Sequence, residues 1–161
     1  MLTVSIPPDV QRTLCRALKA AGTDECGGVL MGEHMGPGHF AVRHLTVQGG
    51  GRFASFIRET QSALRALRTF FRRSGHDYAR FNYLGEWHSH PSFSVQPSTT
   101  DHQSMLDIVK DVRVGANFVV LLIFKLSHRD ELEGSAHTYL PDGSFGRSTL
   151  VFEGTYELPT L

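Results

Sequence analysis

The sequence predicts a single α/β domain, of the α+β kind, in which a mixed and mainly antiparallel sheet is flanked by helices. Two observations lead to this prediction. Segments with helical apolar spacing are interspersed with short apolar or alternating runs that Gly and Pro bound, and no repeat or linker interrupts them. The length of 161 residues favours one domain, 1–161, with a sizeable core.

The composition is that of an ordinary soluble globular protein. Sixteen basic residues balance sixteen acidic ones, which argues against a chain built mainly to coat nucleic acid or an anionic membrane. Two cysteines, Cys15 and Cys26, are too few for a disulfide framework. The N-terminus lacks the pattern of a signal peptide and no apolar stretch reaches transmembrane length. We therefore expect a cytoplasmic protein whose partners include neither nucleic acid nor membrane.

Three segments have the spacing of amphipathic helices. The first begins at Pro7-Pro8-Asp9 and ends at Gly22, with an apolar stripe of Val10, Leu14, Leu18 and Ala21. The second, 60–73, has a stripe of Thr60, Leu64, Leu67 and Phe71, and its other faces carry Arg65, Arg68, Arg72 and Arg73. Those arginines fit either a solvated face or a patch that binds a partner. The third, 99–112, has an apolar face of Met105, Ile108, Val109 and Val112.

The other periodic segments are typical of strands. A buried strand at 25–32 is followed by a turn at 36–38 and an antiparallel partner at 40–47, and a third strand is expected at 53–57. A central strand at 81–88 and the strongest strand signal, at 117–126, come next. The last two strands, at 133–140 and 148–153, are joined by a turn at Pro141-Asp142-Gly143.

The central strand ends in the stretch EWHSHPSFSVQPSTTD, residues 86–101. Alternate residues of a strand share a face, so His88 and His90 point together. Pro91 and Pro97 stiffen the loop that follows, and this loop can return Asp101 to the two histidines. Two histidines and one carboxylate are typical of a catalytic zinc site, although non-haem iron uses the same ligands. A closed structural zinc site would want four ligands, most often cysteines.

Each half of this pattern has a simpler interpretation. A His-x-His pair in a loop is often polar surface, and Ser98 followed by Asp101 matches a helix cap. The combined pattern is far more specific, because four such positions arise by chance in well under about one in a thousand chains of this length. The residues alone leave Glu86, which shares strand parity with the histidines, open as a catalytic base.

The segment HSHPSFSVQPSTTD, 88–101, resembles the His-x-His-x7-Ser-x-x-Asp signature of the JAMM (MPN+, Mov34/PAD-1) metalloproteases. ECGGVLMG, 25–32, is similar to the glutamate and strand that this family places after its first helix, and the resemblance extends to the strand at 117–126. It implies a cytidine-deaminase-like JAMM/MPN fold and Zn²⁺ held by His88, His90 and Asp101. It also implies that Glu25 rather than Glu86 is the general base and that Ser98 stabilises the oxyanion. Cys26 is expected to pack rather than to bind metal.

The resemblance also implies a substrate class. JAMM enzymes commonly cleave peptide or isopeptide bonds after the C-terminal glycine of ubiquitin or ubiquitin-like proteins. Only about sixteen residues separate Asp101 from the strand at 117, so the long second insertion of many eukaryotic members is not expected. The chain looks like compact prokaryotic members, which are similar to deconjugases paired with E1-like, E2-like and ubiquitin-like proteins, including those of antiviral operons.

We therefore expect a zinc isopeptidase or peptidase that acts on a ubiquitin-like protein or its conjugates, in deconjugation, precursor maturation or both. One alternative is a peptidase that trims a sulfur-carrier protein. Another is a non-catalytic MPN scaffold subunit, although such subunits usually lack ligands and all five positions match here. A zinc nucleoside deaminase fits least, because its Pro-Cys-x-x-Cys is missing.

Overall fold

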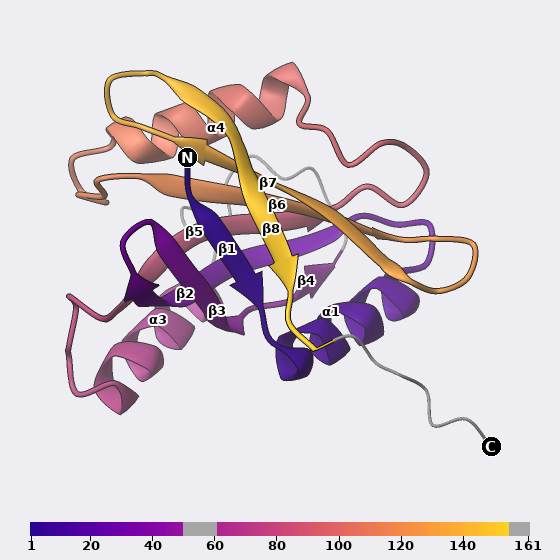
Figure 1. Ribbon diagram of the computed structural model, residues 1–161, viewed down its shortest axis with the longest axis horizontal. Helices are drawn as coiled ribbons and strands as arrows, with labels where there is room; N and C mark the ends of the chain where they lie inside the picture. The colour runs from indigo at the N-terminus through magenta and orange to yellow at the C-terminus, as the bar shows by residue number, and fades with distance from the viewer. Residues whose placement is uncertain (50–60, 155–161) are drawn as a thin grey trace.

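The computed structural model describes residues 1–49 and 61–154 (Figure 1). The elements of this part of the chain are β1 (Thr3–Ile6), α1 (Pro8–Ala21), β2 (Cys26–Gly36), β3 (His39–Leu45), β4 (Gln48–Gly49), α3 (Gln61–Arg73), β5 (Phe81–Ser89), α4 (Thr99–Lys110), β6 (Val119–Leu126), β7 (Leu132–Tyr139) and β8 (Phe145–Phe152). The strand predicted at 53–57 lies outside the described residues. No helix among them is long and apolar enough to span a membrane.

The described strands form one sheet that closes on itself. Its order is β3-β1-β8-β7-β6-β5-β2-β4, and β2 also pairs with β3. The pairs β1–β3, β1–β8 and β5–β6 are parallel. The other five pairs are antiparallel, which confirms the predicted mixed and mainly antiparallel sheet. β5 is central, as expected, between β2 and β6.

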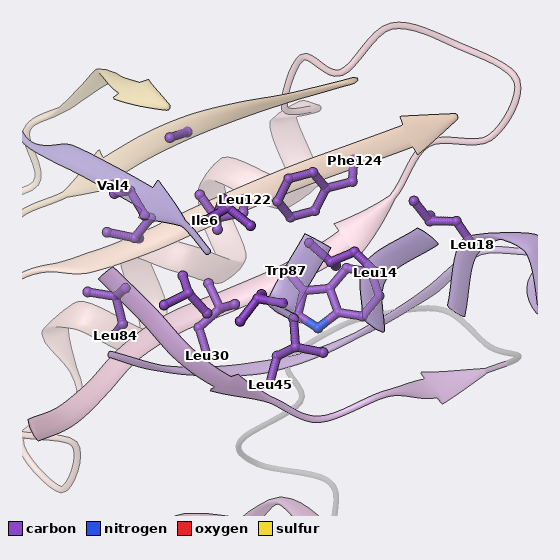
Figure 2. Packing of buried hydrophobic residues seen from close by; sticks show 14 of the residues in the cluster. Val4, Ile6, Leu14, Leu18, Leu30, Leu45, Leu84, Trp87, Leu122 and Phe124 are labelled. Atoms are coloured by element: carbon purple, nitrogen blue, oxygen red, sulfur yellow. The ribbon is translucent and has the colours of Figure 1, made fainter. Parts of the chain in front are cut away.

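Helix α1 packs against one face of this sheet. Its predicted stripe supplies the buried residues Val10, Leu14 and Leu18, and Gly22 ends it with a φ of 62°. Trp87 of β5 is fully buried in the same cluster, where Figure 2 shows its indole close to Leu14 and Leu45. The indole N–H donates to the Thr46 carbonyl at 2.9 Å, so the one polar atom of this ring is satisfied.

Helices α3 and α4 cover the opposite face of the sheet. In α4, Met105, Ile108 and Val109 pack with Val119, Leu121 and Ile123 of β6. In α3, Ala63 and Leu67 pack with Val29 and Met31 of β2. Alternate residues of β6 therefore enter two different cores, because Leu122 and Phe124 face α1. Burial on both faces explains the continuous apolar run that gave the strongest strand signal.

For two residues of the predicted helical stripes, the prediction that they face the core is wrong. Val112 is 92% exposed, because α4 ends at Lys110 and the chain turns away from the core. Leu64 is 42% exposed, because α3 is rotated so that Ala63 and Leu67 face β2 instead.

Strand β1 is missing from the sequence prediction. It has four residues and two of them are polar, so its alternation of apolar and polar residues is too short to identify a strand. Its buried Val4 and Ile6 complete the core around α1. Its place between β3 and β8 depends on partners far away in the chain.

We expect Gly85→Ala to destabilise the fold strongly. Gly85 has a φ of 149°, and a Cβ atom there would lie 1.9 Å from the Val120 carbonyl oxygen of β6. Because the obstacle is backbone, relief requires the β5–β6 pair to move, at a cost of at least about 1–3 kcal/mol. Gly36→Ala is the matched control, since its Cβ would meet nothing within 4 Å. Urea unfolding of both variants measures the difference, and equal midpoints would contradict this account of β5.

Candidate metal centre

The two histidines of the central strand meet at its C-terminal end. His88 and His90 are buried, and their Nε2 atoms lie 3.1 Å apart. Ser89 between them points to the other side, where its Oγ accepts a hydrogen bond of 2.9 Å from the Cys26 N–H. This confirms the predicted alternation. Two imidazole nitrogens this close require either a shared proton or a cation between them.

Asp101 reaches the histidines from the first turn of α4. Its Oδ1 lies 3.4 Å from His88 Nε2, and its Oδ2 lies 3.8 Å from His90 Nε2. In the described part of the chain these three residues form a group whose candidate ligand atoms all lie within 4.8 Å of one another. Tetrahedral zinc with bonds of about 2.0–2.1 Å separates its ligands by roughly 3.3 Å. The observed spacing therefore fits one such ion, with a donor set that suits zinc and also iron.

The pKa shifts of Asp101 and His90 favour metal binding at neutral pH. Burial alone would raise the pKa of Asp101, but the hydrogen bond and charge of His88 and the contacts of Ser98 hold this pKa well below its usual range. Burial lowers the pKa of His90, against the opposing effect of its hydrogen bond to Ser94. Asp101 is thus ionised and His90 neutral, which are the forms that coordinate a metal.

The ring of His90 is oriented by the loop that follows it. Its Nδ1 lies 2.7 Å from the Ser94 carbonyl oxygen. A carbonyl only accepts, so this hydrogen bond assigns the proton to Nδ1. The Nε2 lone pair then points toward Asp101 and His88, as a ligand requires.

Ser98 caps α4 and holds Asp101 at the same time. Its Oγ accepts from the Asp101 N–H at 3.1 Å, and its N–H donates to Asp101 Oδ2 at 2.7 Å. This is the reciprocal capping box expected from the sequence. The hydroxyl proton of Ser98 is not used by this contact, and the residue is exposed. Ser98 can therefore cap the helix and hold the candidate metal ligand Asp101 at the same time.

Glu25 directly precedes β2 and is half-buried. Gly27 pairs with His88, and continuing this register places Glu25 opposite His90. Cys26 packs in the core against α1, as predicted, so Glu25 faces the side of the histidines. Its charge raises the pKa of His90, although burial outweighs this effect.

Glu86 lies one step further into the sheet than His88, on the same face. It pairs with Val29 on one side and Leu121 on the other, and it is 5% exposed. Glu86 is not a member of the group that could hold a metal. The described structure thus brings His88, His90 and Asp101 together, and the continued register of β2 with β5 would carry Glu25 toward His90.

Two buried polar residues of β7 at the edge of the centre were not singled out from the sequence. The Ser135 hydroxyl donates to the Val95 carbonyl in the loop between His90 and Ser98. His137 Nε2 lies 3.0 Å from Ser135 Oγ. The sequence feature that could have identified them is the alternation of side chains in the strand at 133–140. It places Ser135 and His137 on the face that packs under α4.

Residues 7–134 match the family model of prokaryotic homologues of the JAB domain. A relative from Vibrio cholerae serotype O1, named CD-NTase/cGAS isopeptidase, is 34% identical over 93 residues. The match covers 55% of this chain and 57% of the relative, so it spans little more than half the length of that protein.

Two solution structures have a similar fold. A protein from Desulfitobacterium hafniense aligns with a TM-score of 0.62 and 18% identity, over 96% of this chain and 95% of the other. A protein from Salinibacter ruber aligns with a TM-score of 0.53 and 22% identity, over 99% and 95%. At such identities these structures speak for the fold alone. With the family match, the observed architecture confirms the predicted fold class.

The buried His137 should make the folded chain sensitive to acid. Burial, His102 and Arg147 lower the pKa of His137 from 6.5 to about 4. The unfolded chain therefore takes up this proton first, and stability falls by about 3 kcal/mol as the pH drops from about 6.5 to about 4. His137→Gln, which retains an N–H donor, should not show this loss of stability at low pH. Urea unfolding at several pH values measures it, and identical pH profiles for wild type and variant would contradict the assignment.

Proposed function

Because the chain belongs to the family of prokaryotic homologues of the JAB domain, we propose that it is a zinc-dependent isopeptidase or peptidase that cleaves after the C-terminal glycine of a ubiquitin-like protein. The observation that carries this proposal is the group of His88, His90 and Asp101, whose candidate ligand atoms all lie within 4.8 Å of one another. The name of the Vibrio cholerae relative, an isopeptidase, supports the reaction class.

His88, His90 and Asp101 would hold the ion through two Nε2 atoms and one carboxylate oxygen. When bound, zinc supplies Lewis-acid chemistry, lowering the pKa of a coordinated water to about 7 and polarising a carbonyl. Three protein ligands leave a fourth position for water or substrate, as catalytic zinc sites require. The donor set contains no cysteine, which favours a catalytic over a structural role.

Glu25 would serve as general base and then as general acid. Its carboxylate accepts a proton as a water oxygen attacks the scissile carbonyl carbon, and it returns this proton to the amine when the C–N bond breaks. The register of β2 with β5, continued by two residues beyond the Gly27–His88 pair, supports this role. No covalent intermediate with the protein is needed, in accord with the packing of Cys26 in the core.

Ser98 would stabilise the oxyanion. Its Oγ accepts the Asp101 N–H, and its exposed hydroxyl would donate its proton to the developing negative charge. A single donor of this kind contributes about 3 kcal/mol to transition-state stabilisation in other hydrolases. Ser98 is also the N-cap of α4, where the helix dipole favours negative charge.

We further propose that the substrate belongs to a bacterial ubiquitin-like conjugation system with E1-like and E2-like proteins, in the cytoplasm. The relative's name links an isopeptidase with CD-NTase/cGAS, which favours a role in antiviral defence. The trimming of a sulfur-carrier protein uses the same chemistry and remains the alternative substrate. The complete ligand group argues against a non-catalytic scaffold subunit.

The proposal is tested with ubiquitin-like proteins that end in Gly-Gly and carry a fluorescent protein fused after the last glycine. We expect cleavage directly after this glycine, loss of cleavage with a chelator and recovery with zinc. Glu25→Gln should lower kcat by about 10²–10⁴-fold, because a general base is lost, while the zinc content stays at the wild-type level.

Asp24→Asn is the matched control for this experiment. It removes a negative charge from the neighbouring exposed position and should leave kcat close to that of wild type. Undiminished activity of Glu25→Gln would refute the assignment of the base. Cleavage that persists after full removal of metal would refute the zinc mechanism.

A further inference from the structure

The loop 91–97, between His90 and α4, is held by hydrogen bonds at two neighbouring carbonyls. The Ser94 carbonyl accepts from His90 Nδ1 at 2.7 Å. The next carbonyl, that of Val95, accepts from the Ser135 hydroxyl of β7. One hydrogen bond thus orients a candidate ligand, and the adjacent one fixes the segment that provides its acceptor.

The direction of each hydrogen bond around Ser135 follows from its partners. The Val95 carbonyl can only accept, so the single hydroxyl proton of Ser135 is used there. His137 Nε2, 3.0 Å away, must then donate its proton to Ser135 Oγ. Burial keeps His137 neutral at neutral pH, with a pKa of about 4, so this ring has one N–H to give. The result is a directed chain from His137 through Ser135 to Val95.

Ser135 is close to the centre but cannot be a ligand. His88 pairs with Ile123 of β6, and Ile123 pairs with Ser135 of β7. The two residues therefore lie in one row across the sheet, two strand spacings or about 10 Å apart. The Ser135 hydroxyl is directed at the loop and is 2% exposed. Any influence on the metal must pass through the loop.

The packing of the Val95 side chain also connects the loop to the metal centre. The Val95 side chain packs against the cluster that α4 forms with β6 and Tyr139. The loop is therefore attached to the same rigid layer that positions Asp101. A loop fixed at Val95 keeps the Ser94 carbonyl in place, and this carbonyl selects the His90 tautomer with a free Nε2.

We propose that Ser135, oriented by His137, is a positioning residue of the metal centre: it anchors the Val95 carbonyl so that the neighbouring Ser94 carbonyl holds His90 in its metal-binding tautomer. This inference rests on the proposed function, because it concerns the same centre. It extends that function to a residue of β7 that contacts neither metal nor substrate. Ser135→Ala should disturb His90 without changing any ligand.

The test compares Ser135→Ala with Ser148→Ala, the matched control. Ser148 is also a buried serine, on the next strand β8, but its hydroxyl contacts Thr138 at 2.7 Å rather than the loop. Zinc affinity is measured by competition with a chelating dye. The tautomer of His90 is measured in the metal-free chain through its ¹⁵N–¹H couplings.

For Ser135→Ala we expect zinc affinity to fall by about 10-fold or more, as for other residues that support a ligand. We also expect a loss of the pure Nδ1–H tautomer of His90 and a lower kcat with little change in KM. Ser148→Ala should leave zinc affinity and the tautomer unchanged. Ser135→Cys fills the same space with a weak donor and should weaken zinc binding in the same direction.

Wild-type zinc affinity and an unchanged His90 tautomer in Ser135→Ala would overturn the inference. Equal losses in Ser148→Ala would also overturn it, because they would reflect general destabilisation. If the wild-type chain bound no zinc, the proposed function would fail. The tautomer of His90 in the metal-free variants would then still decide this inference.

Discussion

The alternation of side chains along β5 is the constraint on which the centre depends. Trp87 is fully buried against α1, where its N–H has a partner in Thr46, so this residue cannot turn to the other face. His88 and His90 must then face α4 together. A slip of one residue in the register of β5 would place both histidines in the apolar core. The same packing that stabilises the fold thus determines where a metal could bind.

The capping box at α4 joins stability and chemistry in one pair of residues. Ser98 and Asp101 satisfy each other's backbone N–H groups, and an N-cap of this kind contributes about 1 kcal/mol to stability. The same contacts fix the carboxylate that approaches His88. A helix start is rigid and locally encoded, which suits a centre built from distant segments.

Features that depend on local spacing could be predicted from the sequence. Strand parity placed His88 and His90 together, and the cap motif placed Asp101 at a helix start. Only the resemblance pointed to Glu25. Its relation to His90 depends on the register of β2 with β5, which local spacing does not reveal. The anchoring of Val95 by Ser135 could not be predicted, since it joins residues 40 positions apart through a loop without periodicity. The rotation of α3 that exposes Leu64 likewise depends on how the helix packs on β2.

The binding of zinc to the metal-free chain, measured by calorimetry, tests the central claim most directly. Our account predicts one zinc ion per chain at neutral pH. It also predicts that Asp101→Asn, which keeps an acceptor for the Ser98 N–H, weakens zinc binding. Loss of a residue that only supports a ligand lowers metal affinity by about 10–100-fold, and the loss in Asp101→Asn should be larger. Asp107→Asn, on the exposed side of α4, should bind as wild type does. Absence of stoichiometric zinc in the wild-type chain, or equal affinity in Asp101→Asn, would contradict the account.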